Sequence, residues 1–94
     1  MEILMNIDEL FSVIDKRVKN KTKNSYTNKL LNLGPKKIAQ KFGEEANELV
    51  VDFLKGSKKR TVEEAADVIY HFLVLLKSKK IPISELYKEL EKRK

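Results

Sequence analysis

The sequence predicts an all-α fold, a helical bundle in a single domain that spans residues 1–94. Apolar side chains recur at three- and four-residue intervals along most of the 94 residues, which is the spacing of one helix face. Three glycines, two prolines and the lack of alternating Val, Ile and Thr leave little room for a sheet. Because a chain this short buries only a small core, we expect an oligomer to complete the bundle.

Composition excludes several classes of function. The chain has no cysteine, which excludes thiol catalysis, disulfides and thiolate metal sites. No apolar run reaches transmembrane length and Met1–Met5 is too short for a signal peptide, so the expected location is the cytoplasm, with no membrane partner. The net charge is +6, but lysines and acids gather in different segments, which favours a polyanionic ligand over a nucleic-acid surface.

The N-terminal third of the chain is expected to hold two helices. Apolar spacing predicts the first over residues 6–19. Residues 19–28 are polar and are interpreted as a solvated connection or a ligand loop. Thr27 is expected to cap a short helix that Gly34 ends.

Three further helices are predicted in the remaining two thirds. One runs over residues 35–55, begins with a proline suited to a first helical turn, and stops at Gly56. Thr61-Val-Glu-Glu64 is a capping-box pattern, which predicts the start of a helix over residues 61–78. Ser84 is expected to cap the last helix.

Four carboxylates stand out against this background. The helix predicted over residues 61–78 is apolar nearly all round, which indicates burial, yet it carries Glu64 and Asp67. Glu45 and Glu48 have the same spacing on the preceding helix, and the short connection predicts antiparallel packing that brings all four together. Converging carboxylates repel one another, and a cation relieves the repulsion. The spacing therefore predicts a Mg²⁺ or Mn²⁺ site that stays open to a phosphorylated ligand.

Each of these residues also has a simpler explanation. Acid pairs at this spacing are common on solvated helices, and Glu64 is equally explained as a capping-box acid; only the joint occurrence favours a metal. His71 continues the Glu64–Asp67 stripe and is interpreted as a hydrogen-bonded core residue or a neighbour of the ligands. Lys41 is either an ion-pair partner of the acids one turn later or a phosphate contact.

Three segments together resemble one enzyme family. They are Ser25-Tyr-Thr-x-x-Leu-x-x-x-Gly34, Lys37-Ile-x-x-Lys-x-Gly-Glu-Glu-Ala-x-Glu48 and Glu63-Glu-Ala-Ala-Asp-x-x-Tyr-His71. The acidic motifs alone are similar to the all-α NTP pyrophosphohydrolases, the MazG-like group. The Ser-Tyr-Thr run and the Tyr-His ending narrow the resemblance to the phosphoribosyl-ATP pyrophosphohydrolases, which carry out the second step of histidine biosynthesis. The resemblance covers residues 7–93.

The resemblance implies hydrolysis of phosphoribosyl-ATP to phosphoribosyl-AMP and pyrophosphate. It implies that Mg²⁺, or Mn²⁺, is held by Glu45, Glu48, Glu64 and Asp67, with Glu44 as a further ligand or the group that orients water. The substrate-binding residues that follow from it are Ser25, Tyr26, Thr27, Lys29, Lys37 and Lys41. It also implies a homodimer or a larger homo-oligomer. The chain contains no cyclohydrolase domain, so that activity is expected on a separate protein.

Two alternatives remain open at this point. The first is a house-cleaning dNTP pyrophosphatase of the same superfamily. The second is a basic helical module that binds nucleic acid or a partner helix, which predicts steeply salt-dependent binding and no need for Mg²⁺. Carboxylates within an apolar helix argue against the second, because such a module has no use for them.

Overall fold

The computed structural model describes residues 5–20 and 25–94, and these residues form five helices and no strand. The helices are α1 (Ile7–Lys19), α2 (Tyr26–Leu33), α3 (Pro35–Lys55), α4 (Lys58–Ser78) and α5 (Ile83–Lys92). The predicted all-α class is therefore confirmed. Residues 21–24, in the middle of the predicted polar connection, lie outside the described residues. None of the helices in the described part of the chain is long and apolar enough to cross a membrane.

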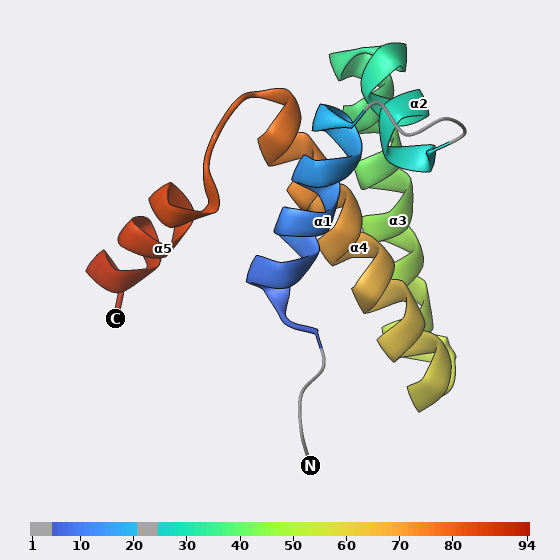
Figure 1. The fold of residues 1–94 in the computed structure, drawn as a ribbon. Coiled ribbons are helices and arrows are strands. Elements are labelled where there is room, and N and C mark those ends of the chain that lie inside the picture. Colours follow the sequence, from blue (N-terminus) through green and yellow to red (C-terminus); the bar gives the residue numbers. More distant parts are fainter. Residues whose placement is uncertain (1–4, 21–24) are drawn as a thin grey trace.

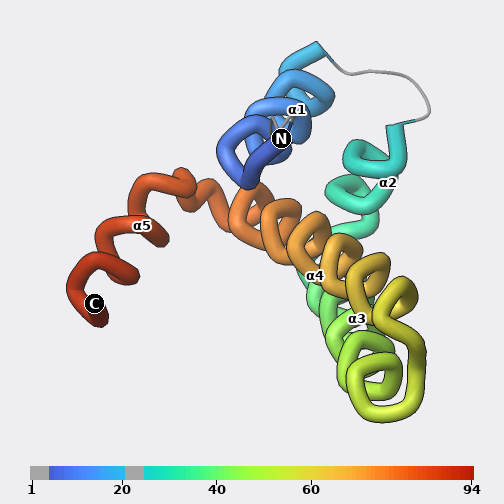
Figure 2. Tube along the Cα trace, turned by 90° about the horizontal axis from the view of Figure 1, so that it is seen from below, coloured from blue at the N-terminus to red at the C-terminus, as the bar shows by residue number. Residues whose placement is uncertain are grey.

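Two long helices, α3 and α4, run antiparallel and side by side (Figure 1). Each has 21 residues, which corresponds to a length of about 30 Å. Only Gly56 and Ser57 connect them, so the second helix must fold back along the first. Figure 2 shows that α1 and α2 pack against this pair, whereas α5 projects away from it. This hairpin is the frame that places the acidic residues of the two helices opposite one another.

The core lies where α1 and α2 cover the hairpin. Its buried apolar side chains are Ile14, Leu30, Ile38, Leu73, Val74 and Leu76. The other half of the hairpin, next to the α3–α4 connection, is not covered. Exposed apolar side chains there are Val50, Val51, Phe53, Leu54 and Val62. The burial predicted for the apolar side chains of this helix is thus reached only in the half of α4 that α1 and α2 cover, by Leu73, Val74 and Leu76.

The predicted start of α4 is wrong by three residues. Its N-cap is Ser57, whose Oγ accepts a hydrogen bond from the backbone N–H of Arg60 at 3.1 Å. The hydroxyl of Thr61, the predicted cap, instead donates to backbone carbonyls, including that of Ser57 at 2.9 Å. Ser57 rather than Thr61 is the N-cap because it follows Gly56, where α3 ends, and has the extended conformation that an N-cap needs. Glu64 therefore lies in the second turn of α4 and is not a capping-box acid.

Two other predicted caps are also wrong. Ser25, in an extended conformation, caps α2, and Thr27 lies within that helix as a buried residue. The helix α5 begins at Ile83 without a side-chain cap, and the predicted cap Ser84 is its second residue. Here Pro82 is already extended and acts as the N-cap position. The predicted bounds of α1 and α3 agree with the structure to within one residue.

Candidate active site

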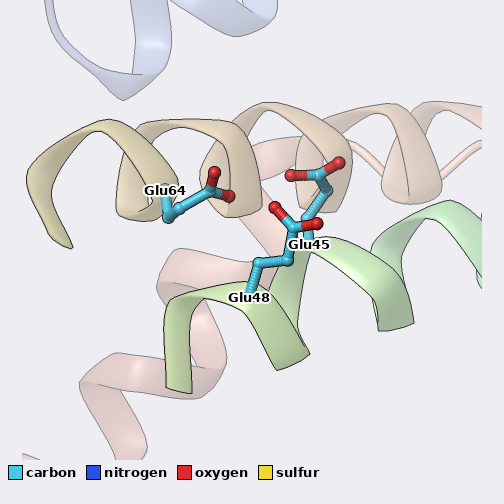
Figure 3. A group of neighbouring side chains, drawn as sticks. All are labelled: Glu45, Glu48 and Glu64. Atoms are coloured by element: carbon cyan, nitrogen blue, oxygen red, sulfur yellow. The ribbon is translucent and has the colours of Figure 1, made fainter. Parts of the chain in front are cut away.

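Three carboxylates from α3 and α4 meet between the two helices (Figure 3). One oxygen each from Glu45, Glu48 and Glu64 lies within 4.8 Å of the others, and we call these three residues the acidic cluster. Glu45 and Glu48 lie one turn apart on α3, and the antiparallel hairpin brings Glu64 of α4 opposite them. The convergence expected from the sequence therefore occurs for three of the four acids.

Glu64 is the most constrained member of the acidic cluster. The residue is only 4% exposed. Its Oε1 accepts a hydrogen bond from Arg60 Nη2 at 3.1 Å, whereas its Oε2 has no hydrogen-bond partner among the described residues. Burial raises the pKa of Glu64, and so do Glu45 and the charge of Asp67, against the opposing effect of Arg60. A buried carboxylate oxygen without a donor is costly, and a cation between the carboxylates would satisfy it.

Asp67 lies one turn after Glu64 on α4, and its side chain is outside the acidic cluster. It is close enough for its charge to contribute to the raised pKa of both Glu64 and Tyr26. Its backbone carbonyl accepts a hydrogen bond from His71 Nδ1 at 2.7 Å. Asp67 therefore borders the cluster at the side that faces α2.

A tyrosine of α2 reaches this border. The Tyr26 hydroxyl lies 2.9 Å from His71 Nε2. Because the Asp67 carbonyl can only accept, we assign the ring proton of His71 to Nδ1, and the Tyr26 hydroxyl then donates to Nε2. Burial raises the pKa of Tyr26, while the charge of Lys41 opposes that shift. His71 is thus a buried, hydrogen-bonded residue that holds Tyr26 beside Asp67, in line with the interpretation as a core residue or a neighbour of the ligands.

The other residues of the Ser-Tyr-Thr run are turned inward. Thr27 is fully buried, and its hydroxyl hydrogen-bonds to that of Tyr70 on α4. Ser25 is also buried and caps α2. Tyr26, at 47% exposed, is the one residue of the three with substantial surface for a ligand. Lys29, further along α2, is exposed.

Two of the lysines predicted to bind the substrate, Lys37 and Lys41, lie on α3. Lys41 Nζ lies 3.6 Å from a carboxylate oxygen of Glu44. Glu44 also accepts a hydrogen bond from Gln40, and this bond is the largest cause of its lowered pKa. The charge of Lys41 lowers the pKa further, whereas burial opposes the shift. Lys37 donates to the Gln40 side chain at 3.3 Å. Glu44 is therefore held along the exposed side of α3, next to the acidic cluster but not within it.

Sequence reasoning missed Arg60. Its guanidinium lies 3.1 Å from Glu64, 3.4 Å from Glu63 and 3.6 Å from Asp52. The i, i+4 spacing to Glu64 is a recognisable ion-pair signal on a helix. This spacing was not recognised as an ion pair, because the capping-box interpretation placed Arg60 in a turn before the helix.

The sequence of the chain was compared with those of known proteins. Residues 7–94 match the family described as phosphoribosyl-ATP pyrophosphohydrolase. A phosphoribosyl-ATP pyrophosphatase of Sulfolobus acidocaldarius is 44% identical over 87 residues, which are 93% of this chain and 92% of that protein. One of Pyrobaculum neutrophilum is 45% identical over 92 residues, 98% of this chain and 95% of that protein.

A fused relative matches as well. The histidine biosynthesis bifunctional protein HisIE of Bacteroides thetaiotaomicron is 45% identical over 92 residues, which are 98% of this chain but 45% of that protein. The family match extends over nearly the whole chain and includes the α3–α4 hairpin that carries the acidic cluster. The chain therefore belongs to the phosphoribosyl-ATP pyrophosphohydrolase family.

Proposed function

We propose that this chain hydrolyses phosphoribosyl-ATP to phosphoribosyl-AMP and pyrophosphate at the acidic cluster, with Mg²⁺ or Mn²⁺ held by Glu45, Glu48, Glu64 and Asp67. Membership of the family makes the chain a phosphoribosyl-ATP diphosphatase, a hydrolase of histidine biosynthesis. The observation that carries the site assignment is that Glu64, whose carboxylate belongs to a cluster of three, has a buried Oε2 that lacks a donor among the described residues. The proposed cytoplasmic location goes with this activity, since nucleotide intermediates are kept within the cell.

The residues present fit a hard divalent cation. Mg²⁺ prefers oxygen ligands and commonly takes one or two carboxylates together with substrate phosphates. The acidic cluster offers carboxylates from two helices, and Asp67 adds a fourth on the side of Tyr26. When bound, Mg²⁺ would offset the charge that develops on the phosphate oxygens as the α–β phosphoanhydride bond breaks.

The remaining residues have roles that follow from their placement. Lys41, which lies 3.6 Å from Glu44 and whose charge acts on Tyr26, neutralises the triphosphate together with Lys37 and Lys29. Glu44 orients the attacking water from the edge of the acidic cluster. Tyr26 contacts the substrate, whereas Ser25 and Thr27 serve the substrate site by fixing the position of Tyr26. Water adds across the α–β bond, and pyrophosphate leaves.

We also propose that the chain works as a homodimer or a larger homo-oligomer. The support is the uncovered half of the hairpin, where Phe53 and Leu54 are 72% and 70% exposed. Contiguous exposed apolar side chains on a small protein mark an association surface. A second copy packed on this surface would complete the bundle beside the acidic cluster.

Phosphorus NMR of phosphoribosyl-ATP incubated with the purified protein tests the proposal. We expect pyrophosphate release that requires Mg²⁺ and is lost on chelation. A panel of dUTP and dCTP under the same conditions serves as the control for substrate class. No release from phosphoribosyl-ATP by a protein with intact helical circular dichroism would contradict the proposal, and faster turnover of the dNTPs would favour the dNTP pyrophosphatase alternative.

A further inference from the structure

Arg60 connects the two helices that build the acidic cluster. It lies in the first turn of α4, and its guanidinium reaches Glu64 on the same helix and Asp52 across on α3, at 3.1 and 3.6 Å. A third acid, Glu63, lies 3.4 Å away. The arginine side chain is itself 53% exposed, while those of Glu64 and Asp52 are only 6% and 18% exposed. A half-exposed cation is therefore held by two acids that are themselves largely buried.

Among the described residues, Arg60 is the cation that forms an ion pair with a member of the acidic cluster. Lys41, the next candidate, pairs with Glu44 outside the cluster. Three carboxylates within 4.8 Å repel one another strongly unless a positive charge is near. The second oxygen of Glu64, buried and without a donor among these residues, shows that Arg60 compensates the site only in part.

We propose that Arg60 is the resident counter-ion of the acidic cluster and that a divalent cation displaces it from Glu64. The inference rests on the proposed metal site and adds a residue to it. A metal ion on Glu64 places two like charges close together, which disfavours the Arg60–Glu64 pair. Moving the guanidinium away from Glu64 costs little free energy, because the guanidinium is half exposed and keeps Asp52 and Glu63 as partners. Arg60 thus preserves the arrangement of the carboxylates before metal arrives and weakens the affinity for metal.

The extra stabilisation of the metal-free fold by Arg60 and the weakening of metal binding must be equal in free energy, because folding and metal binding form a closed thermodynamic cycle. If Arg60 stabilises the metal-free fold more than the metal-bound fold, the difference reduces the free energy of metal binding by the same amount. Removal of the arginine is therefore expected to lower the melting temperature of the metal-free protein and to tighten metal binding. With saturating metal, the difference in melting temperature is expected to become smaller, because only the pair with Glu64 is lost on metal binding and those with Asp52 and Glu63 remain.

The test compares the full-length wild type with Arg60→Gln, Arg60→Lys and the control Lys59→Gln. Lys59 lies in the same turn and forms no ion pair in the described part of the chain, so its change removes only general positive charge. Mn²⁺ binding is measured by electron paramagnetic resonance, and melting by circular dichroism without metal and with saturating Mg²⁺. We expect Arg60→Gln to bind Mn²⁺ about three- to tenfold more tightly than the control.

The lysine variant keeps the charge but loses the planar fork that spans two carboxylates, so its affinity is expected to lie between those of the wild type and Arg60→Gln. It supplies the affinity comparison if Arg60→Gln folds only in the presence of metal, an outcome that itself supports the inference. Equal or weaker Mn²⁺ binding by both Arg60 variants would overturn the inference and make Arg60 a clamp that orients Glu64. A folded wild type that binds no Mn²⁺ would instead overturn the proposed metal site, and the inference with it.

Discussion

The two halves of the α3–α4 hairpin differ in how fully their apolar side chains are buried and their buried polar atoms are hydrogen-bonded. In the half covered by α1 and α2, the side chains of Leu73 and Val74 are fully buried, and polar residues pair with one another, as Thr27 does with Tyr70. In the half next to the connection, Phe53 is exposed and an oxygen of Glu64 is buried without a donor among the described residues.

The difference indicates that the covered half mainly provides stability, whereas the uncovered half carries the groups proposed for activity. The covered half holds its own groups by packing and hydrogen bonds, and it fixes Tyr26 from behind through His71. For the uncovered half we have proposed two partners beyond the single chain, a cation for its carboxylates and a second copy for its apolar side chains. Substitutions in the two halves should therefore affect different measurements.

The largest expected effect is on catalysis by the uncovered half. Glu48→Gln removes a charge from the acidic cluster without changing the size of the side chain. We expect turnover to fall by about 100-fold or more, because loss of a metal ligand removes stabilisation of the developing phosphate charge. Pyrophosphate release measures the rate, and circular dichroism checks the fold.

The control for that change is Glu85→Gln in α5, which removes an exposed acid far from the cluster in the sequence. Its turnover should match that of the wild type. Near-normal activity of Glu48→Gln beside a normal control would contradict the metal-site proposal.

The next effect concerns assembly. Phe53→Asp places a charge in the exposed apolar surface near the α3–α4 connection, and we expect it to shift the protein from oligomer to monomer. Sedimentation velocity measures the mass of both proteins at the same concentration. Leu33→Asp, at an exposed apolar position of α2, is the matched control and should leave the mass unchanged. An unchanged oligomer in Phe53→Asp would place the contact surface elsewhere.

A pair of substitutions in the covered half sharpens the distinction between positioning and stability. Thr27→Val leaves the Tyr70 hydroxyl without its buried partner, so we expect urea denaturation to show a loss of about 1–2 kcal/mol in the free energy of unfolding. Tyr26→Phe removes the hydroxyl that lies beside Asp67, and we expect KM for phosphoribosyl-ATP to rise by about three- to tenfold with a smaller change in kcat.

Steady-state kinetics of both variants separates these effects. At temperatures where the Thr27→Val protein is folded, its KM should change less than that of Tyr26→Phe, because Thr27 acts on the substrate only through the position of Tyr26. A larger KM effect for Thr27→Val than for Tyr26→Phe would mean that the buried threonine, rather than the exposed tyrosine, governs substrate binding.

The smallest effect is a pH dependence at the far end of the bundle. A hydrogen bond from Lys77 holds the pKa of Asp15 below its usual value of 3.8, despite an opposing effect of burial. The lowered pKa means that the folded state prefers the ionised form, so this stabilisation is present above about pH 4 and is lost as the pH falls through the folded pKa. Asp15→Asn should therefore lower the melting temperature at pH 7 but hardly at pH 2. An equal deficit at both values would mean that packing, not charge, explains the loss.

The sequence predicted the elements that depend on local spacing. Apolar periodicity and the proline and glycine at its ends defined α3, and the three-residue spacing of Glu45 and Glu48 indicated their common face. The start of α4 was missed because Ser57 and Thr61 both suit an N-cap, and only the conformation of the backbone decides between them.

Contacts between helices were harder to predict. The burial of Thr27 against Tyr70 depends on how α2 packs on α4, which periodicity does not encode. The offset of Asp67 from the acidic cluster likewise depends on the rotation of α4 about its axis and on the direction of a side chain. Spacing in one helix therefore identified the candidate ligands but did not determine which of them meet.

The central claim is that the acidic cluster binds a divalent cation through the buried carboxylate of Glu64. The most direct measurement is a Mn²⁺ titration of the wild type and Glu64→Gln followed by electron paramagnetic resonance. We predict saturable binding by the wild type and a loss of at least about tenfold in affinity for the variant, whose amide lacks the charge and presents N–H donors to the cation. Equal affinity of the two folded proteins would contradict the claim.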